Sequence, residues 1–406
     1  MNAPLLTPSR RGFRAPGTTF MVSGGLIGAV GAYLFQVYGA RRLDPEAFAP
    51  ISVLWTAFFI LATILLVPVE QYVTREVASG RKALPGDLKP TLAMTAIGSL
   101  IGAVFVFVTR EDLFLGDSIY VVQIVLLMLG YALLFVAKGV LAGARRFAGV
   151  GWVLIVETAV RLLAGVLLLQ LVVDASSLGW AMVIGGFSVL ALAWWRHDTG
   201  RSEAPAAPAG PFLAGYVGGT SSSQVLLGGA PIAVAALGGS PALVSIVFVT
   251  FTLYRAPLTL IFSLQGRILP YLVGLSREAN HHQLMRIARG VVIGGAGLAV
   301  AGGLVGWLVG PEVVGILYGE EYMPTALVSM LAAGGVMAAA SAQIASQVLV
   351  AEGRTARLSW AWLGGLLVGV LVLILAGGLP DTRVATAFAA GEIAALGLMA
   401  LLAIRR

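Results

Sequence analysis

Long apolar stretches, separated by short polar connectors, recur along the whole chain of 406 residues. A helix needs about 20 predominantly apolar residues to cross the ~30 Å hydrocarbon core of a bilayer, and twelve stretches come close to that length. The first six are Thr18–Tyr38, Pro50–Tyr72, Thr91–Val108, Ile119–Ala137, Val150–Val173 and Leu178–Trp195. The second six are Phe212–Leu237, Ala242–Leu264, Gly290–Val309, Pro324–Val350, Leu358–Gly377 and Val384–Ile404. This pattern predicts an all-α integral membrane protein with twelve transmembrane helices.

The basic residues predict which loops face the cytoplasm, because short loops rich in Lys and Arg stay inside. With the N-terminus inside, the inner segments hold 20 of the 26 basic residues and 6 acidic ones. The outer loops then hold 4 basic and 10 acidic residues. We therefore expect both termini in the cytoplasm and a multi-pass protein of the cytoplasmic (inner) cell membrane. The formal charge of +7 then reflects topology, and no nucleic-acid partner is expected.

A polar segment, residues 196–211, divides the predicted helices into six and six. Its sequence, RHDTGRSEAPAAPAGP, has the Pro, Ala and Gly content of a flexible linker. We expect a cytoplasmic tail at 1–17, a six-helix lobe at 18–195, this linker, and a second six-helix lobe at 212–406. The segments VLAGARR and VLVAEGR follow the fourth and tenth predicted helices and resemble each other weakly. They favour two pseudo-symmetric lobes around a midplane site, as in many transporters.

The residue types that most enzymes and metal centres use are scarce. The chain has no cysteine, and its three histidines, His197, His281 and His282, lie in polar connectors. The longest predicted outer loops have about a dozen residues, too few to carry the catalytic acids of a membrane enzyme. The sequence also lacks the common nucleotide-binding and hydrolase motifs. We expect no enzyme activity, no metal site and no cofactor.

Five charged residues lie inside predicted helices: Glu70, Glu157, Arg161, Arg255 and Glu392. A charge near the bilayer centre costs at least ~2.5–3.5 kcal/mol, so each one needs a partner, water or a function. Glu157 and Arg161 are four residues apart and share one face of a helix. They form either a structural pair or a cavity-lining pair, in which Arg161 holds substrate and Glu157 takes a cation or proton.

Arg255 has no acid within one helical turn, and its planar fork suits the phosphate or carboxylate of a substrate. The alternative is that it pairs with Glu70 or Glu157 across the interior. Glu70 is a second candidate for ion coupling, although it lies close enough to a helix end to reach the surface. Glu392 has no nearby partner in the sequence, and no role is predicted for it. The neutral polar candidates for a wet interior are Gln36, Ser221, Gln224 and Gln343.

Four segments of the chain match patterns of one known family. They are ARRLDPEAF (40–48), VLAGARRFAGVGWVLIVETAVRLLAGVLL (140–168), ILPYLVGLSRE (268–278) and ILYGEEY (316–322). In these segments the chain resembles the polysaccharide-exporter and lipid-linked oligosaccharide flippase family of the multidrug/oligosaccharidyl-lipid/polysaccharide (MOP) superfamily. The resemblance implies two six-helix lobes around a central cavity that opens to alternate sides of the membrane.

The same resemblance implies a flippase or exporter of a lipid-linked oligosaccharide or polysaccharide precursor. Its anionic phosphate would meet arginines of the cavity, with Arg255 as the first candidate and Arg161 as the second. Its partners would be membrane lipids, a glycan polymerase and glycosyltransferases. The alternative in the superfamily is a cation-coupled multidrug or metabolite antiporter, which would select cations through Glu70 or Glu157. Less favoured alternatives are a membrane enzyme of glycan assembly and a scaffold that transports nothing.

Overall fold

The computed structural model describes residues 17–79, 88–192, 209–256, 281–352 and 354–404, together with Leu258, Leu272 and Leu275. Within these ranges every regular element is a helix. Most of the predicted tail and most of the predicted linker lie outside the described residues. Residues 209–211, which the prediction assigned to the linker, already belong to a helix.

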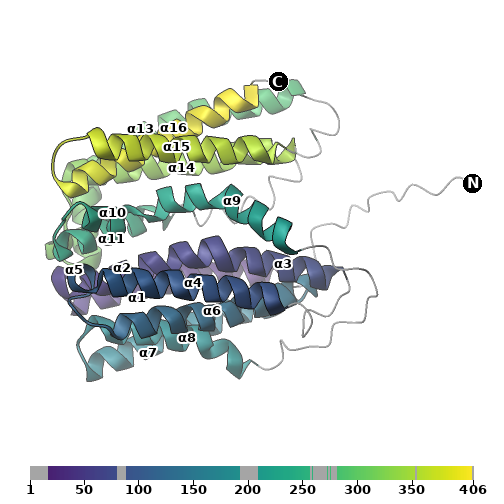
Figure 1. Ribbon diagram of the computed structural model, residues 1–406. Helices are drawn as coiled ribbons and strands as arrows, with labels where there is room; N and C mark the ends of the chain where they lie inside the picture. The colour runs from purple at the N-terminus through teal and green to yellow at the C-terminus, as the bar shows by residue number, and fades with distance from the viewer. Residues whose placement is uncertain are drawn as a thin grey trace, which may run out of the picture.

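The first half of the chain forms one bundle of helices, which we call the N-terminal lobe (Figure 1, purple to teal). Its elements are α1 (Thr18–Arg42), α2 (Pro45–Leu61), η1 (Ala62–Leu66), α3 (Val67–Ala78), α4 (Leu88–Val108), α5 (Arg110–Leu113), α6 (Ile119–Gly143), α7 (Phe147–Leu171), α8 (Ala175–Phe187) and η2 (Ser188–Ala191). The π-helical turn η1 joins α2 to α3 without a break, so the three elements form one continuous helix, Pro45–Ala78.

The second half forms a second bundle, the C-terminal lobe, which lies above the first in Figure 1. Its elements are α9 (Ala209–Gly228), α10 (Ala230–Ala236), α11 (Pro241–Tyr254), α13 (His281–Tyr318), η4 (Glu320–Tyr322), α14 (Ala326–Ala351), α15 (Thr355–Leu375) and α16 (Pro380–Ile404). Helix α9 packs on α15 of its own lobe and also contacts α3 of the other lobe.

Successive helices run back and forth along one axis (Figure 1). We call the end where α1 begins the proximal end. The distal end is the opposite one, with the α1–α2 turn, α5, α10 and η4. Under the predicted topology the proximal end faces the cytoplasm.

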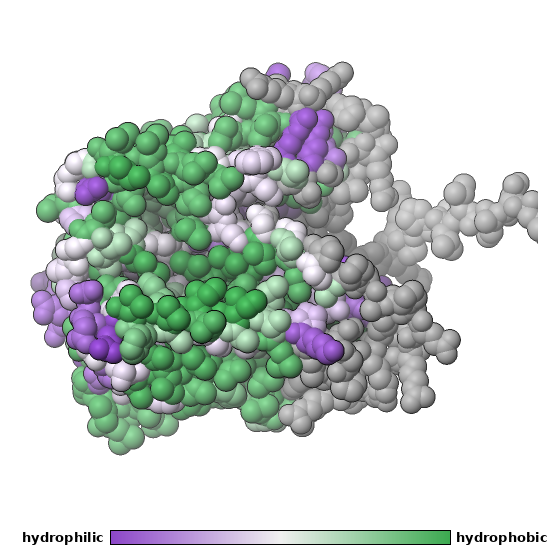
Figure 2. Space-filling view, in the orientation of Figure 1, coloured by the Kyte–Doolittle hydropathy of each residue, from purple (hydrophilic) through white to green (hydrophobic). Residues whose placement is uncertain are grey.

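The surface of the bundles suits lipid. In the described residues, nine helices are long and apolar enough to cross a membrane, and Ala175–Ala191 and Pro241–Tyr254 are shorter apolar helices. Large apolar side chains point outward, such as Leu171, which is 79% exposed, and the face in Figure 2 is largely hydrophobic. The chain is a multi-pass membrane protein by these criteria. The count of twelve helices and the side of the termini stay predictions.

The predicted helix Phe212–Leu237 is not continuous. It is divided into α9 and α10 at Gly229. Pro231 has no backbone N–H to donate to the carbonyl four residues earlier, and its ring clashes with that carbonyl. Hydropathy alone does not reveal this break, because both parts are apolar.

Close packing of α1 on α7 depends on glycine. A Cβ atom added at Gly24 would lie 2.6 Å from the Cα of Gly151, so the two backbones touch at this crossing. One residue further along α1, a Cβ at Gly25 would meet nothing within 4 Å. Gly24 therefore acts in helix packing, as small residues do in membrane bundles generally.

We expect Gly24→Ala to lower the melting temperature of the purified protein, because the methyl group forces α1 away from α7. Overpacking of this kind typically costs about 1–3 kcal/mol. Gly25→Ala is the matched control, and we expect it to be neutral or stabilising, since Ala favours helix by about 1 kcal/mol over Gly. Equal melting temperatures for the two variants would contradict the packing described here.

Candidate substrate site between the lobes

A cavity of about 250 Å³ lies where the two lobes meet. Helices α1 and α2 form its wall on one side, and α9 and α11 form it on the other. Its lining is mostly apolar and aromatic, with a few polar groups, as in most small-molecule sites. The residues that matter for the argument below are Tyr33, Gln36, Trp55, Gln224, Phe248 and Arg255.

Arg255 provides the charge of this cavity. It caps the C-terminal end of α11, where its backbone N–H donates to the carbonyl oxygens of Phe251 and Thr252. A cation at this end is favoured by the helix dipole. Its guanidinium lies 5.7 Å from the centroid of the Phe251 ring. The Nε and Nη2 atoms are buried, and neither has a hydrogen-bond partner in the described part of the chain.

Polar groups of α1 and α9 complete the cavity. The hydroxyl of Tyr33 donates to the carbonyl oxygen of Thr252 at 2.9 Å, which ties α1 to α11. Gln36, one turn further along α1, is buried, and its Oε1 atom has no partner among the described residues. Gln224 faces the cavity from α9. The cavity thus offers an anion the guanidinium group of Arg255 and the side-chain amides of Gln36 and Gln224.

The structure brings together three of the six predicted binding residues, Gln36, Gln224 and Arg255. Ser221 instead donates its hydroxyl to the carbonyl oxygen of Val217 in its own helix, at 2.6 Å. Gln343 is buried in α14 and is not among the residues that line the cavity. The sequence did not predict an aromatic wall of the cavity, which consists of Tyr33, Trp55 and Phe248. Aromatic residues of a core and of a cavity have the same spacing on a helix, so spacing alone does not distinguish them.

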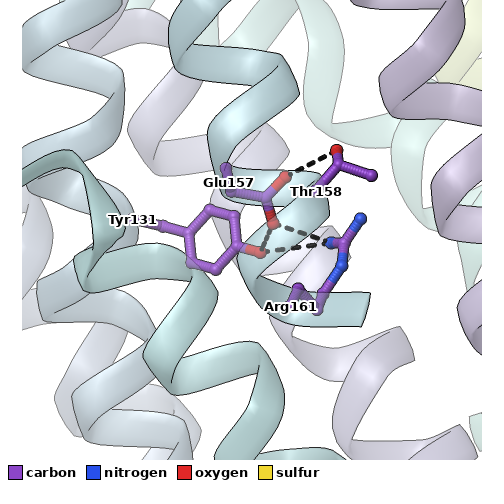
Figure 3. Close-up of polar contacts among 4 residues, drawn as sticks. All are labelled: Tyr131, Glu157, Thr158 and Arg161. Atoms are coloured by element: carbon purple, nitrogen blue, oxygen red, sulfur yellow. Dashed lines mark hydrogen bonds and ion pairs between the residues drawn. The ribbon is translucent and has the colours of Figure 1, made fainter. Parts of the chain in front are cut away.

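Glu157 and Arg161 form a closed polar cluster in the N-terminal lobe (Figure 3). Arg161 Nη1 lies 3.0 Å from Glu157 Oε1. The hydroxyl of Tyr131, from α6, donates to the same oxygen at 2.6 Å, and the hydroxyl of Thr158 donates to Oε2 at 3.1 Å. Both members of the ion pair are buried. The cluster therefore neutralises itself and joins α7 to α6.

Arg161 supports the cavity wall from behind. Its guanidinium lies 5.6 Å from the ring of Phe35 on α1 and 5.3 Å from that of Trp55 on α2. Trp55 is part of the cavity lining, but Arg161 is not. In this conformation the pair has the geometry of the structural alternative, and Arg161 contacts the cavity lining only through the ring of Trp55 among the described residues.

We expect Glu157→Gln to destabilise the protein strongly, because it leaves Arg161 buried without a counter-ion. Removing one partner of a buried pair costs about 3–5 kcal/mol. Adding Arg161→Met removes the orphan cation, so the double variant should regain much of the lost stability. Thermal unfolding of the protein in detergent measures both. A single variant as stable as the wild type would show that the cluster does not hold α6 and α7 together.

Glu70 also has a partner, which the sequence did not predict. Its Oε2 atom lies 2.7 Å from the Nζ atom of Lys138 on α6. The predicted helix ended at Ala137, which placed Lys138 in an inner loop. Helix α6 continues to Gly143, so Lys138 is part of the helix. Since Glu70 pairs with Lys138 and Glu157 with Arg161, the alternative in which one of them pairs with Arg255 is wrong for this structure.

The lobes are joined at the distal end by hydrogen bonds to backbone carbonyls. Arg41, at the end of α1, donates to the carbonyl oxygens of Ile316 and Leu317 in the last turn of α13. The hydroxyl of Tyr322 in η4 donates to the carbonyl oxygen of Leu43 at 2.9 Å. We call these bonds the distal contact. They connect two of the segments that carry the family resemblance, ARRLDPEAF and ILYGEEY.

Aromatic packing surrounds the distal contact. The ring of Phe48 lies 6.0 Å from that of Tyr322 and 6.2 Å from that of Phe248, which also lines the cavity. Burial raises the pKa of the Tyr322 hydroxyl, and the nearby Asp44 and Glu321 raise it further. The hydroxyl therefore keeps its proton and stays a donor. The distal contact and these rings therefore join the two lobes at this end.

We expect Arg41→Ala to weaken the distal contact and separate the lobes at the distal end. The chain has no cysteine, so cysteines introduced at the exposed positions Glu46 and Glu320 can be spin-labelled specifically. The label-to-label distance should shift to longer values in the variant. Arg42→Ala is the matched control, since the guanidinium of Arg42 lies over Tyr38 of its own helix. The same shift in both variants would contradict a specific role of Arg41.

Comparison with known sequences leaves the family open. No family model matches the chain. Uncharacterized proteins of Mycobacterium tuberculosis and Mycobacterium bovis are each 26% identical to it over 396 residues, which cover 91% of this chain and 88% of theirs. These relatives extend over nearly the whole length and have no assigned role.

Comparison with solved structures is more informative. An inward-facing multidrug resistance MATE family transporter of the MOP superfamily matches with a TM-score of 0.68 and 12% identity, over 95% of this chain and 97% of its own. A MATE transporter of Vibrio cholerae matches with a TM-score of 0.62 and 15% identity, over 96% and 95%. The chain has the fold of the MOP-superfamily transporters. A third match, a MOP transporter of Pyrococcus furiosus, has a TM-score of 0.66 and 12% identity, over 95% and 94%.

These three structures are at most 15% identical to the chain, so the likeness shows its fold. They confirm the fold of the superfamily but not the resemblance to the polysaccharide-exporter and flippase family within it.

Proposed function

We propose that the chain is an alternating-access transporter of the multidrug or metabolite type, and that its cargo is a small amphipathic molecule with a negative group. The observation that carries the proposal is Arg255, whose Nε and Nη2 atoms are buried at the cavity between the lobes without a hydrogen-bond partner in the described chain. A guanidinium in this state favours a carboxylate, sulfonate or phosphate, which it can bind bidentately.

The size and lining of the cavity support a small cargo. About 250 Å³ is close to the lower limit of small-molecule sites, and the aromatic wall suits a flat apolar body. Tyr33 and Trp55 would pack on that body while Arg255 binds its charged group. An amphipathic anion therefore fits better than a fully polar one.

The charge of the cavity argues against a cationic cargo. The antiporter hypothesis assigned cation selection to Glu70 or Glu157, and both carboxylates are already paired with a basic residue. A cation in the cavity would meet the positive charge of Arg255. The Pyrococcus furiosus neighbour is itself described as having a binding pocket of reversed polarity that suggests a different function.

Alternating access follows from the arrangement of the lobes. The distal contact joins them at one end. The TM-score of 0.68 with an inward-facing transporter is higher than the 0.59 with an outward-facing one. We propose that the structure represents the state in which cargo enters from the proximal side, and that the proximal side faces the cytoplasm.

A lipid-linked oligosaccharide is the second candidate cargo. Arg255 would suit the phosphate of such a precursor, as the family resemblance implies. A glycan polymerase and glycosyltransferases would then be partners, with membrane lipids around the lobes. The cavity volume of about 250 Å³ favours the smaller cargo.

We expect the wild-type protein in lipid nanodiscs to bind naphthalene-2-sulfonate, a small aromatic anion, and not tetraphenylphosphonium, an apolar cation. Arg255→Gln should weaken sulfonate binding about 10- to 100-fold, because a hydrogen bond to a charged group contributes about 1.5–3 kcal/mol. Arg110→Gln is the control, since Arg110 is exposed and pairs with Glu111 at the distal end.

Calorimetric titration measures these affinities, and uptake into proteoliposomes measures transport. Preference for the cation, or sulfonate binding unchanged by Arg255→Gln, would contradict an anionic cargo. A fluorescent polyprenyl-phosphate sugar, tested in the same proteoliposomes, distinguishes the second candidate. Its movement across the bilayer, without transport of the sulfonate, would favour the flippase.

A further inference from the structure

One charged side chain, Glu392, takes no part in the contacts described so far. It lies in the middle of α16, it is 0% exposed, and neither carboxylate oxygen has a hydrogen-bond partner among the described residues. A buried ionised carboxylate without such bonds is strongly unfavourable. Unsatisfied groups of this kind are rare in native structures and call for a specific explanation.

Two aromatic rings place Glu392 at the depth of Arg255. Phe251 on α11 and Phe388 on α16 pack edge to face, with their centroids 5.0 Å apart. Both helices run from the distal toward the proximal end, and Arg255 and Glu392 each follow their ring by four residues. Residues four apart lie on one face of a helix, about 6 Å along its axis. The two charges thus lie at the same depth, one turn beyond the ring pair.

Arg255 is the charged group that acts on Glu392 in the described structure. The two attract each other without a hydrogen bond between them. Tyr33 of α1 is the other ionisable group that acts on Arg255. Among the described residues, the other neighbours of this part of α16 are not ionisable: Leu226 of α9, Gly295 of α13, Gly335 of α14, Gly365 of α15, and α10, with the sequence APIAVAA.

We propose that Glu392 is the proton-binding counter-ion of Arg255, and that it takes up one proton when an anionic cargo binds. This inference rests on the proposed function, since it requires that the cargo binds Arg255. Burial by itself favours the protonated form of Glu392, and in the empty cavity the positive charge of Arg255 offsets that effect and keeps the carboxyl group ionised. A bound anion cancels that charge, so the buried carboxyl group then accepts a proton from bulk solvent.

The direction of the coupling follows from reciprocity. Because anion binding raises the proton affinity of Glu392, protonation of Glu392 must raise the anion affinity by the same factor. The affinity for an anion therefore increases as the pH falls, by up to about tenfold per pH unit while one proton is taken up. Cargo and proton therefore occupy the protein together. Exchange of cargo for protons would give the opposite pH dependence.

The test is calorimetric titration of the full chain in nanodiscs with naphthalene-2-sulfonate, whose sulfonate stays ionised at every pH used. Titrations in two buffers of different ionisation enthalpy count the protons taken up. We expect about one proton for the wild type and tighter binding at lower pH. Glu392→Gln imitates the protonated carboxyl group. It should bind without proton uptake, independently of pH, and at least as tightly as the wild type does at low pH.

Glu312→Gln is the matched control, because Glu312 is an exposed carboxylate of α13 in the same lobe. It should keep the pH dependence of the wild type. Infrared difference spectra of the wild-type protein provide a measurement that needs no variant. Adding the sulfonate should produce the carbonyl band of a protonated carboxyl group.

Proton release by the wild type, binding that is independent of pH, or full proton uptake by Glu392→Gln would each overturn the coupling. So would the absence of a new carboxyl band. A wild-type protein that fails to bind the sulfonate at any pH would instead contradict the anionic cargo of the proposed function. The two proposals therefore fail in different ways.

Discussion

Charges among apolar helices must be balanced inside the protein, because lipid supplies neither water nor counter-ions. Two pairs in the N-terminal lobe meet this requirement, Glu157 with Arg161 and Glu70 with Lys138. The first pair also holds Trp55 through its guanidinium. Of the five charges predicted within helices, the two that form no such pair among the described residues are Arg255 and Glu392, both in the C-terminal lobe, and Arg255 lies at the cavity. The paired charges stabilise the N-terminal lobe, whereas the guanidinium of Arg255 is available to a ligand in the cavity.

The contacts within a lobe differ in kind from the contacts between the lobes. Within the N-terminal lobe, glycine lets α1 and α7 approach until their backbones touch. Between the lobes, Arg41 and Tyr322 donate to backbone carbonyls, and Ser245 donates to the carbonyl oxygen of Pro45 at 2.6 Å. The last carbonyls of a helix have no partner within that helix, so the end of α13 is a natural acceptor for Arg41. Such bonds can break and form again as lobes move, whereas backbone packing within a lobe changes little.

The sequence predicted the helical, lipid-embedded character of the chain because the bilayer requires long apolar helices. It also predicted that Arg255 lacks a local partner and that Gln36 and Gln224 face the interior, and both of these amides line the cavity. It did not predict Lys138 as the partner of Glu70, since the two are 68 positions apart and belong to different helices. It also placed Ser221 in the cavity, although that hydroxyl bonds within its own helix. Hydropathy and spacing describe single helices and contain no information on which faces meet.

The amino-acid sequence by itself determined the apolar helices, the separation of basic from acidic loops, and the few charges within the helices that require an explanation. Only the tertiary structure decided how those charges are used. It paired Glu157 with Arg161 and Glu70 with Lys138. It also placed Arg255 at a cavity between the lobes, and the packing of Phe251 on Phe388 brought Glu392 to the depth of Arg255. The physical reason is that the environment of a buried charge depends on neighbours from other helices, and their approach is set by packing of the whole bundle.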